Sequence, residues 1–396
     1  MASVCFYFQV HQPHRLRRYS VFDAHARYFD RQRNREILRT VAQKCYLPAT
    51  ETLLRLIHRH EGAMRVAFSL TGCVLEQLEA DCPEVLDNFR RLAETGCCEF
   101  LGETYYHSLA FLYSQQEFRE QVELHADLVE DLFGQVPSVF RFTELIYNNE
   151  LGRLIAEQGR YRGILAEGVD ANLGERSPDH LYTAAGHPEV DLLLRNYSLS
   201  DDVAFRFSDP GWNQWPLTAD RYADWIQAGA DRGSELFNLF MDFETFGERQ
   251  HKDSGIFPFL DALPGRLIDR GLEFRTPSEC IETCKPVGEY DVPEATSWAD
   301  SERDLSAWRG NAMQSSALAE LYRLEEKVKQ HGDDELIADW RCLTSSDHFY
   351  YMCTKFFEDG EVHRYFNAYE SPYDSYINFM NVLDNLRSRV EAVAPA

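Results

Sequence analysis

Short hydrophobic runs recur along the chain before residue 245. Seven of them are continuous rather than alternating, which is typical of strands buried on both faces. Amphipathic, helix-like stretches separate most of these runs, for example Arg35–His60, Val74–Glu94, Gln115–Phe133 and Ala219–Ala230. Alternating strands and helices predict an α/β fold with a parallel sheet, and seven such units favour a barrel. The runs are Val4–Val10, Arg65–Leu70, Cys98–Leu101, Ser138–Phe142, Gly163–Ala166, Val190–Leu194 and Leu236–Met241.

Polar residues stand directly after several of these runs. His11 follows the first run, Glu103 the third, Glu144 the fourth and Asp242 the seventh. In barrels of parallel strands, catalytic groups gather at the C-terminal ends of the strands, on one face. We therefore expect these four side chains to meet at one rim.

The pattern changes after residue 296, where no clear strand remains. Trp298–Gln330, Asp333–Thr344 and Tyr373–Val390 read as helices. The stretch Lys285–Pro293 contains two prolines and a glycine, which is typical of a connector. The sequence thus predicts a catalytic barrel over residues 1–290 and a C-terminal helical domain over residues 291–396 that contributes to the active-site cleft.

Composition narrows the class of protein. The 396 residues are 44% hydrophobic and 27% charged, as in ordinary globular proteins. The formal net charge of −25 argues against nucleic acid or membrane partners, because such a field repels phosphate backbones and anionic lipids. Aromatic residues make up 13%, which suits a sugar-binding cleft as well as a large core.

The N-terminus and the cysteines indicate a cytoplasmic protein. The first residues, MASVCFYFQVHQP, contain no basic n-region, and no apolar run approaches the roughly 18 residues of a membrane helix. The ten cysteines form no CxxC motif. We interpret them as reduced thiols.

Glu144 lies in the segment VFRFTELIYNNEL, where an apolar strand ends. A carboxylate in such a place is costly unless it is used, hydrogen-bonded or paired. It is therefore a candidate catalytic group. The alternative is a structural ion pair with Arg141.

Asp242 lies in the segment LFNLFMDFETFGERQ, after six mostly large and apolar residues. An apolar setting favours the neutral carboxyl form that a general acid needs. Glu244 and Glu248 follow closely, so the pattern leaves open which carboxyl is the acid. The three acidic residues are also compatible with a cation site.

Two further segments in the first half of the chain bring histidines close to strand ends. FQVHQPHRLRRY contains His11 and His14, and EFLGETYYHSLAFL contains Glu103 and His107. These groups suit hydrogen bonding to sugar hydroxyls, and His11 also suits metal binding. A capped loop histidine and a buried supporting network are the alternatives.

Two segments in the C-terminal part carry similar groups. If TSWADSERDLSAWRGNAMQ is helical, Asp304, Trp308 and Asn311 share one face, which suits a sugar subsite. A helix that docks onto the barrel through Trp308 is the alternative. TSSDHFYYM adds Asp347 and His348 beside a run of aromatic residues.

Together these five segments, in this order and at these separations, resemble the signature regions of glycoside hydrolase family 57. The motifs HQP, GETYYHSL, TELIYNNE, MDFETFGE and SWADSERDLSAW are closest to its α-amylase branch, which includes archaeal α-amylases. The resemblance spans roughly residues 5–350. It implies a (β/α)7 distorted TIM-like barrel followed by a C-terminal α-helical domain, acting on α-1,4-glucans with retention and without a metal or other cofactor.

The resemblance also implies roles for residues. Glu144 matches the nucleophile, and Asp242 matches the general acid/base. His11, Glu103, Trp298 and Asp347 match positions that shape the donor-side subsites. The match extends to further substrate-binding positions, which are His107, Asp304, Trp308 and His348. One departure is Gln9, where some relatives, including glucanotransferases, carry a histidine.

Several functions remain open at this stage. The same two carboxyl groups serve an α-amylase, a 4-α-glucanotransferase and a glycogen branching enzyme, which differ in the acceptor. A metal-dependent carbohydrate deacetylase would need clustered histidine ligands, of which His11 and His14 could supply two. A non-catalytic glycan-binding protein is a further alternative. The motifs favour the hydrolase, with starch- or glycogen-type glucans or maltooligosaccharides as its partners.

Overall fold

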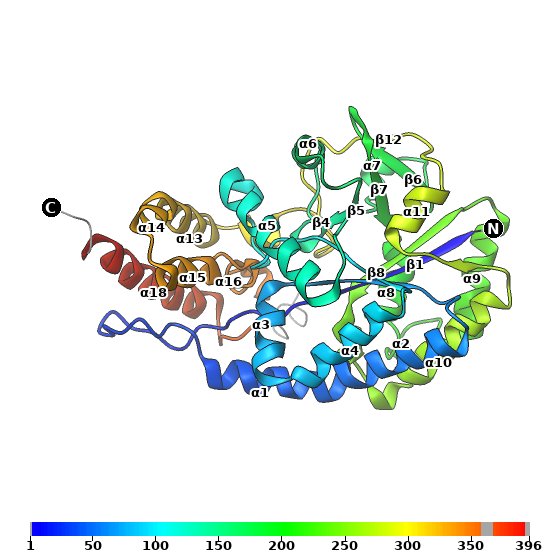
Figure 1. The fold of residues 1–396 in the computed structure, drawn as a ribbon, viewed down its shortest axis with the longest axis horizontal. Helices are drawn as coiled ribbons and strands as arrows, with labels where there is room; N and C mark the ends of the chain where they lie inside the picture. The colour runs from blue at the N-terminus through cyan, green and yellow to red at the C-terminus, as the bar shows by residue number, and fades with distance from the viewer. Residues whose placement is uncertain (1, 358–366, 393–396) are drawn as a thin grey trace.

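The computed structural model describes residues 2–357 and 367–392. All seven predicted runs form strands: β1 (Ser3–Val10), β2 (Val66–Leu70), β3 (Cys98–Phe100), β4 (Val139–Arg141), β5 (Gly163–Glu167), β7 (His187–Arg195) and β8 (Leu236–Asp242). Strands β8, β1, β2 and β3 pair in parallel, as do β4, β5 and β7. A bridge between Gly102 and Phe140 joins the two sets on one side, and Asn196 N donates to Asn238 O on the other. The strands thus form the wall of a distorted barrel (Figure 1).

The runs are continuous because both faces of each strand are covered. Along β1, Cys5 and Tyr7 belong to one buried cluster, whereas Phe6 and Phe8 belong to another. The first cluster fills the barrel interior, and the second packs under the surrounding helices. Because successive side chains of a strand point to opposite faces, both sets must be apolar.

The helices follow the predicted pattern with one break. Around the barrel lie α1 (Arg31–Val41), α2 (Leu47–Arg59), α5 (Gln115–Phe133), α6 (Asn149–Gln158), α8 (Tyr197–Ala204), α9 (Ala219–Asp231) and α10 (Ile256–Ile268). A π-helical segment over Ala42–Tyr46 joins α1 to α2. The predicted helix Val74–Glu94 is instead two helices, α3 (Gly72–Asp81) and α4 (Pro83–Glu94). Pro83 ends the first because proline cannot continue a helix interior, although it suits a first turn.

Short strands escaped prediction. β6 (Leu181–Ala184) pairs antiparallel to β7, while β11 (Glu273–Phe274) and β12 (Glu289–Tyr290) extend the two sheets at β1 and β6. β11 and β12 have only two residues each and carry no periodicity of their own, so only their neighbours in space define them.

The C-terminal part is helical, as predicted, but one boundary was wrong. The stretch predicted as the helix Trp298–Gln330 begins as a loop, and its helices are α12 (Ser306–Arg309), α13 (Ala312–Arg323) and α14 (Glu325–His331). α15 (Asp334–Leu343), α16 (Ser346–Tyr350) and α18 (Pro372–Ala392) follow. Residues 358–366 and 393–396 of the predicted C-terminal domain lie outside the described residues. Trp340 and Leu386 share one hydrophobic cluster with Phe140 and Ile164, so the helices and half of the barrel have a common core.

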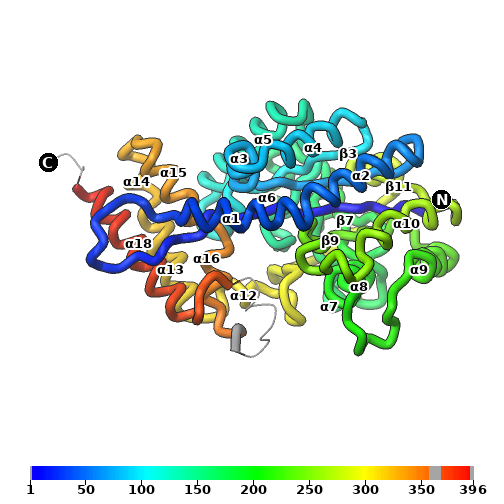
Figure 2. Tube along the Cα trace, turned by 90° about the horizontal axis from the view of Figure 1, so that it is seen from below, coloured from blue at the N-terminus to red at the C-terminus, as the bar shows by residue number. Residues whose placement is uncertain are grey.

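An N-terminal arm, defined here as Leu16–Asp30, connects the barrel to these helices. It leaves the end of β1 and runs beside α18 in both views (Figures 1 and 2). Tyr19 N donates to Asn378 Oδ1 at 2.7 Å, and Tyr28 Oη donates to Asn385 Oδ1 at 2.7 Å. Chain segments far apart in sequence are thereby held together.

Two observations concern the environment of the chain. None of the ten cysteines, all of which lie in the described residues, forms a disulfide. Over the same part of the chain, the helices are either too short or too polar to span a bilayer.

Candidate active site

A cavity of 220 Å³ lies at the C-terminal ends of the barrel strands. It is closed by the C-terminal helical part, which contributes Tyr350 and Tyr351 to its wall. Most of the predicted site residues line it, although they come from segments spread over more than three hundred positions of the chain. These residues are His11, His107, Glu144, Asp242, Trp298, Trp308 and Asp347.

Glu144 is held in an unusual backbone conformation directly after β4. Its φ is 60° and its ψ is 26°, in the left-handed region that non-glycine residues seldom adopt. Its carbonyl oxygen accepts a hydrogen bond from Trp298 N at 3.2 Å. The side chain accepts from Trp298 Nε1 at 2.7 Å and from His107 Nε2 at 3.0 Å. The strained turn therefore aims the carboxyl group at two fixed donors.

The surroundings of Glu144 favour its ionised form. Burial alone would raise the pKa of Glu144, but hydrogen bonding to His107, the charges of His107 and Arg141, and the Trp298 N–H together lower it below its usual range. Burial would likewise lower the pKa of His107, but hydrogen bonds to Glu103 and Glu144 raise it to about 9. A protonated His107 thus lies between two carboxylates at neutral pH.

Arg141 does not form the ion pair with Glu144 that the sequence offered as an alternative. Its side chain is fully buried, and its guanidinium carbon lies 5.0 Å from the centre of the Trp298 ring. The guanidinium of Arg195 lies 5.7 Å from the same ring. The two cations pack against the indole that holds Glu144.

Asp242 ends β8 in a more open and more polar setting than the apolar run predicted. Its side chain is 27% exposed, and its Oδ2 accepts a hydrogen bond from Arg249 Nη2 at 2.9 Å. Glu244 lines the same cavity but is held from behind by Tyr46 Oη and by Gln12 Nε2, the latter at 3.5 Å. Burial, with the nearby charge of Asp242, raises the pKa of Glu244 to about 7.

His11 belongs to a second hydrogen-bonded group on the cavity wall. Its Nε2 lies 2.8 Å from Asp347 Oδ2, and its Nδ1 lies 2.8 Å from Thr71 Oγ1. The His11 ring stacks on the His107 ring, with 4.1 Å between their centres. Burial lowers the pKa of His11, with His107 adding to the effect, so a neutral ring that donates to Asp347 fits this geometry.

Three predicted residues do not line the cavity. Glu103 is fully buried behind His107, 3.5 Å from its Nδ1. Asp304 lies in the loop before α12, where its carboxylate accepts from Ser306 N at 2.8 Å. His348 points away, with its Nε2 3.2 Å from Cys342 O. Glu103 supports the site from behind, whereas the side chains of Asp304 and His348 are engaged elsewhere.

The cavity also contains residues that the sequence did not single out. Arg249 follows Asp242 within the same motif, so its nearness was a usable signal. Arg195 directly follows the predicted strand Val190–Leu194, and Asp300 stands two residues after Trp298 in the motif SWADSERDLSAW, so their positions were usable signals too, whereas Phe205 gave none. All four line the cavity.

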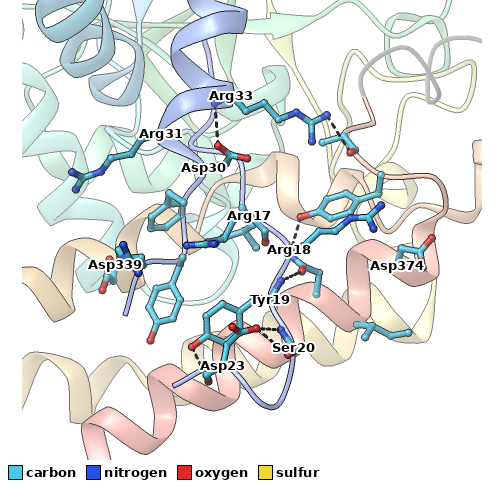
Figure 3. A pocket seen from close by; sticks show the side chains of 18 of the residues that line it. Arg17, Arg18, Tyr19, Ser20, Asp23, Asp30, Arg31, Arg33, Asp339 and Asp374 are labelled. Carbon is cyan, nitrogen blue, oxygen red and sulfur yellow. Dashed lines mark hydrogen bonds between the residues drawn. The ribbon is translucent and has the colours of Figure 1, made fainter. Parts of the chain in front are cut away.

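A larger groove lies elsewhere in the molecule, between the N-terminal arm and helices α15 and α18 (Figure 3). It measures 1610 Å³, but none of the predicted site residues lines it. Its charged side chains are of both signs, among them Arg17, Arg31, Asp30 and Asp339. We place the candidate active site in the smaller cavity, because the two predicted catalytic carboxyl groups, Glu144 and Asp242, both line it.

Metal ligation was one alternative for the histidines. His14 Nε2 lies 3.6 Å from Glu76 Oε2, away from His11 and its partners. Among the described residues, His, Cys, Asp and Glu side chains form no group of three that could hold a metal ion. The geometry therefore gives a zinc-dependent deacetylase no ligand set.

Comparisons with known proteins agree with the motifs and the fold. Residues 5–293 match the model of glycosyl hydrolase family 57. A Methanocaldococcus jannaschii protein provisionally assigned as an alpha-amylase is 40% identical over 395 residues, covering 96% of this chain and 83% of its own length. The structures of a branching enzyme from Thermococcus kodakaraensis and an alpha-amylase from Thermotoga maritima superpose with TM-scores of 0.69 and 0.63.

The two structures share only the fold with this chain, since their identities to it are 15% and 13%. They cover 92% and 100% of this chain, and the matches span 87% and 94% of their own lengths. The family match extends over most of the barrel and its rim. The chain belongs to glycosyl hydrolase family 57 and is an α-amylase-like retaining glycoside hydrolase.

Proposed function

We propose that the protein hydrolyses α-1,4-glucosidic bonds in starch- or glycogen-type glucans or maltooligosaccharides, with Glu144 as nucleophile and Asp242 as general acid/base. The observation that carries the proposal is the hydrogen bonding of Glu144 to His107 and Trp298, which favours an ionised carboxylate at the rim of the barrel. The M. jannaschii relative, provisionally assigned as an alpha-amylase, supports hydrolysis.

In the first step the Glu144 carboxylate attacks the anomeric carbon, and the bond from that carbon to the glycosidic oxygen breaks. The proton of the Asp242 carboxyl group passes to the departing oxygen. Because Oδ2 of Asp242 accepts from Arg249, Oδ1 is the oxygen available to carry that proton. The products of this step are a glycosyl ester of Glu144 and a shortened glucan.

In the second step Asp242 is a carboxylate and accepts a proton from water. The water oxygen forms a bond to the anomeric carbon, the ester bond breaks, and the Glu144 carboxylate is restored. The Arg249 guanidinium stabilises Asp242 in this ionised state. A sugar hydroxyl in place of water would give transfer instead of hydrolysis.

The remaining cavity residues fit a donor-side sugar site. His11, Asp347 and Trp298 line the nucleophile side of the cavity, with Glu103 behind them as support for His107. The proposal also includes the division of the chain into two structural units. The seven strands support a (β/α)7 barrel as the catalytic unit of residues 1–290, and the helices after residue 291 support a second unit that closes the cleft.

Incubation with maltoheptaose tests the proposal directly. We expect the purified chain to release only shorter maltooligosaccharides, with the α-anomer appearing first in a proton NMR time course. The control is Glu144→Gln, which keeps the shape of the side chain and should lose at least about 10³-fold in rate.

Other outcomes would favour the alternatives. Products longer than maltoheptaose would indicate a glucanotransferase or branching activity. Binding of maltoheptaose without turnover in the wild type would indicate a glycan-binding protein. Near-normal turnover by Glu144→Gln would contradict the assignment of the nucleophile.

A further inference from the structure

Phe205 is an exposed aromatic side chain at the edge of the catalytic cavity. The residue is 46% exposed, and it lines the cavity together with Asp242 and Arg249. The other aromatic side chains of the cavity wall are buried or half-buried, namely Trp298, Trp308, Tyr350 and Tyr351. An aromatic ring at the opening of a catalytic cavity offers a flat apolar face on which a bound ligand can pack.

The ring lies on the side of the acid/base and not on that of the nucleophile. The Arg249 guanidinium carbon is 4.5 Å from the centre of the Phe205 ring, while its Nη2 donates to Asp242 Oδ2 at 2.9 Å. Arg249 therefore links the aromatic ring to the acid/base. Glu144 is held by different residues, His107 and Trp298.

The backbone under Phe205 is fixed. Phe205 ends α8, and its N–H donates to Asp201 O at 2.9 Å. Gln250 Nε2 donates to the carbonyl of the preceding Ala204, also at 2.9 Å. Arg195 Nη2 binds the Asp201 side chain at 2.6 Å. The ring thus projects from a tied helix end, as a preorganised contact surface requires.

Chemistry decides what would lie on this ring. The acid/base must stand beside the glycosidic oxygen, so the sugar that departs with that oxygen occupies the Asp242 side of the cavity. The face of a glucose ring carries C–H groups that pack on aromatic rings. We propose that Phe205, held by Arg249, is the stacking platform of the first acceptor subsite, where the leaving-group glucose binds. This inference rests on the proposed function.

Two substrates distinguish a role of Phe205 in binding the leaving-group sugar from a general effect on catalysis. Maltoheptaose carries a leaving-group sugar, whereas α-maltotriosyl fluoride releases fluoride, which needs neither an acceptor subsite nor a proton. For Phe205→Ala we expect the ratio of kcat/KM on maltoheptaose to kcat/KM on the fluoride to fall about tenfold. Phe205→Trp should keep this ratio near that of the wild type, because it retains an aromatic face.

Phe22→Ala is the matched control, since Phe22 is 93% exposed on the N-terminal arm and lines neither the cavity nor the groove. It should leave the ratio unchanged. An unchanged ratio in Phe205→Ala, which includes equal losses on both substrates, would overturn the inference. Activity of the wild type on either substrate tests the proposed function separately, because only the variants test the platform.

Discussion

The two sides of the catalytic cavity hold their carboxyl groups in different ways. Glu144 accepts hydrogen bonds from His107 and Trp298 and sits on a strained left-handed backbone. Asp242 ends a regular strand, is more exposed, and has Arg249 as its hydrogen-bond donor. The residues around Glu144 keep its carboxyl group ionised, whereas the carboxyl group of Asp242 must change between its protonated and ionised forms during the reaction. The protein thus separates the roles of two chemically similar side chains by their surroundings.

The supporting residues differ in the same way. Behind Glu144 a chain of buried groups continues through His107 to Glu103, and Gln9 Nε2 donates to Glu103 at 3.2 Å. Gln9 is the position at which some relatives carry histidine, and here its amide extends this network. On the other side Glu244 is half-buried in the same cavity as Asp242, and burial together with the charge of Asp242 raises its pKa to about 7. One side is therefore organised by hydrogen bonds in series, the other by neighbouring charges.

The largest expected effect is on cleavage that requires protonation of the leaving group by Asp242. Asp242→Asn should slow maltoheptaose cleavage by about 10²- to 10⁴-fold, because the variant cannot protonate the departing oxygen. Formation of the glycosyl-enzyme from α-maltotriosyl fluoride needs no proton, so pre-steady-state release of fluoride should persist. Azide, which needs no general base, should speed turnover and give the α-glycosyl azide.

Glu144→Gln provides the control, since it should abolish fluoride release as well as sugar release. If Asp242→Asn lost both activities equally and azide had no effect, the division of labour between the two carboxyl groups would be refuted.

A smaller effect is expected from the indole that holds Glu144. Trp298→Phe keeps an aromatic ring between the neighbouring arginines but removes the N–H that donates to Glu144 Oε2 at 2.7 Å. We expect kcat to fall about ten- to hundredfold with a smaller change in KM, since the donor orients a charged reactant. Steady-state kinetics on maltoheptaose measures both constants.

Trp225→Phe is the matched control, because Trp225 packs beside Trp212 away from the cavity. A loss confined to KM in Trp298→Phe would assign the indole to substrate binding instead of nucleophile positioning.

The smallest expected effect is on stability rather than rate. The pKa of His107 is raised to about 9 in the folded protein, above the value of about 6.5 for an unfolded chain. The stability that protonated His107 contributes to the fold is therefore complete below pH 6.5 and is lost as the pH rises through about 9. Between pH 7 and 8 we expect a loss of about 1 kcal/mol in the free energy of unfolding. Urea unfolding at both pH values measures it.

His107→Gln should lack this part of the pH dependence. A wild-type stability that stayed constant or rose across that interval, with the variant behaving identically, would show that His107 is not protonated between its two carboxylates.

The hydrophobic pattern determined the barrel. Every one of the seven continuous runs became a strand, because a strand covered on both faces must be apolar at successive positions. The sequence motifs and the ends of the predicted strands also pointed to Glu144, Asp242, His11 and Asp347, and all four residues line one cavity. These residues could be found because each directly follows an element with a strong local signal or lies in a long, specific motif.

Only the tertiary structure decided the partners of those residues. The loop that carries Trp298 was predicted as helix, since its charged and aromatic residues have helical spacing, yet contacts with Glu144 and Tyr147 hold it open. The choice between Arg141 and His107 as partner of Glu144, and the position of Phe205 beside Asp242, depend on segments far apart in the chain. Local sequence fixes which elements form, whereas hydrogen bonds and charges at the rim depend on packing that no single segment encodes.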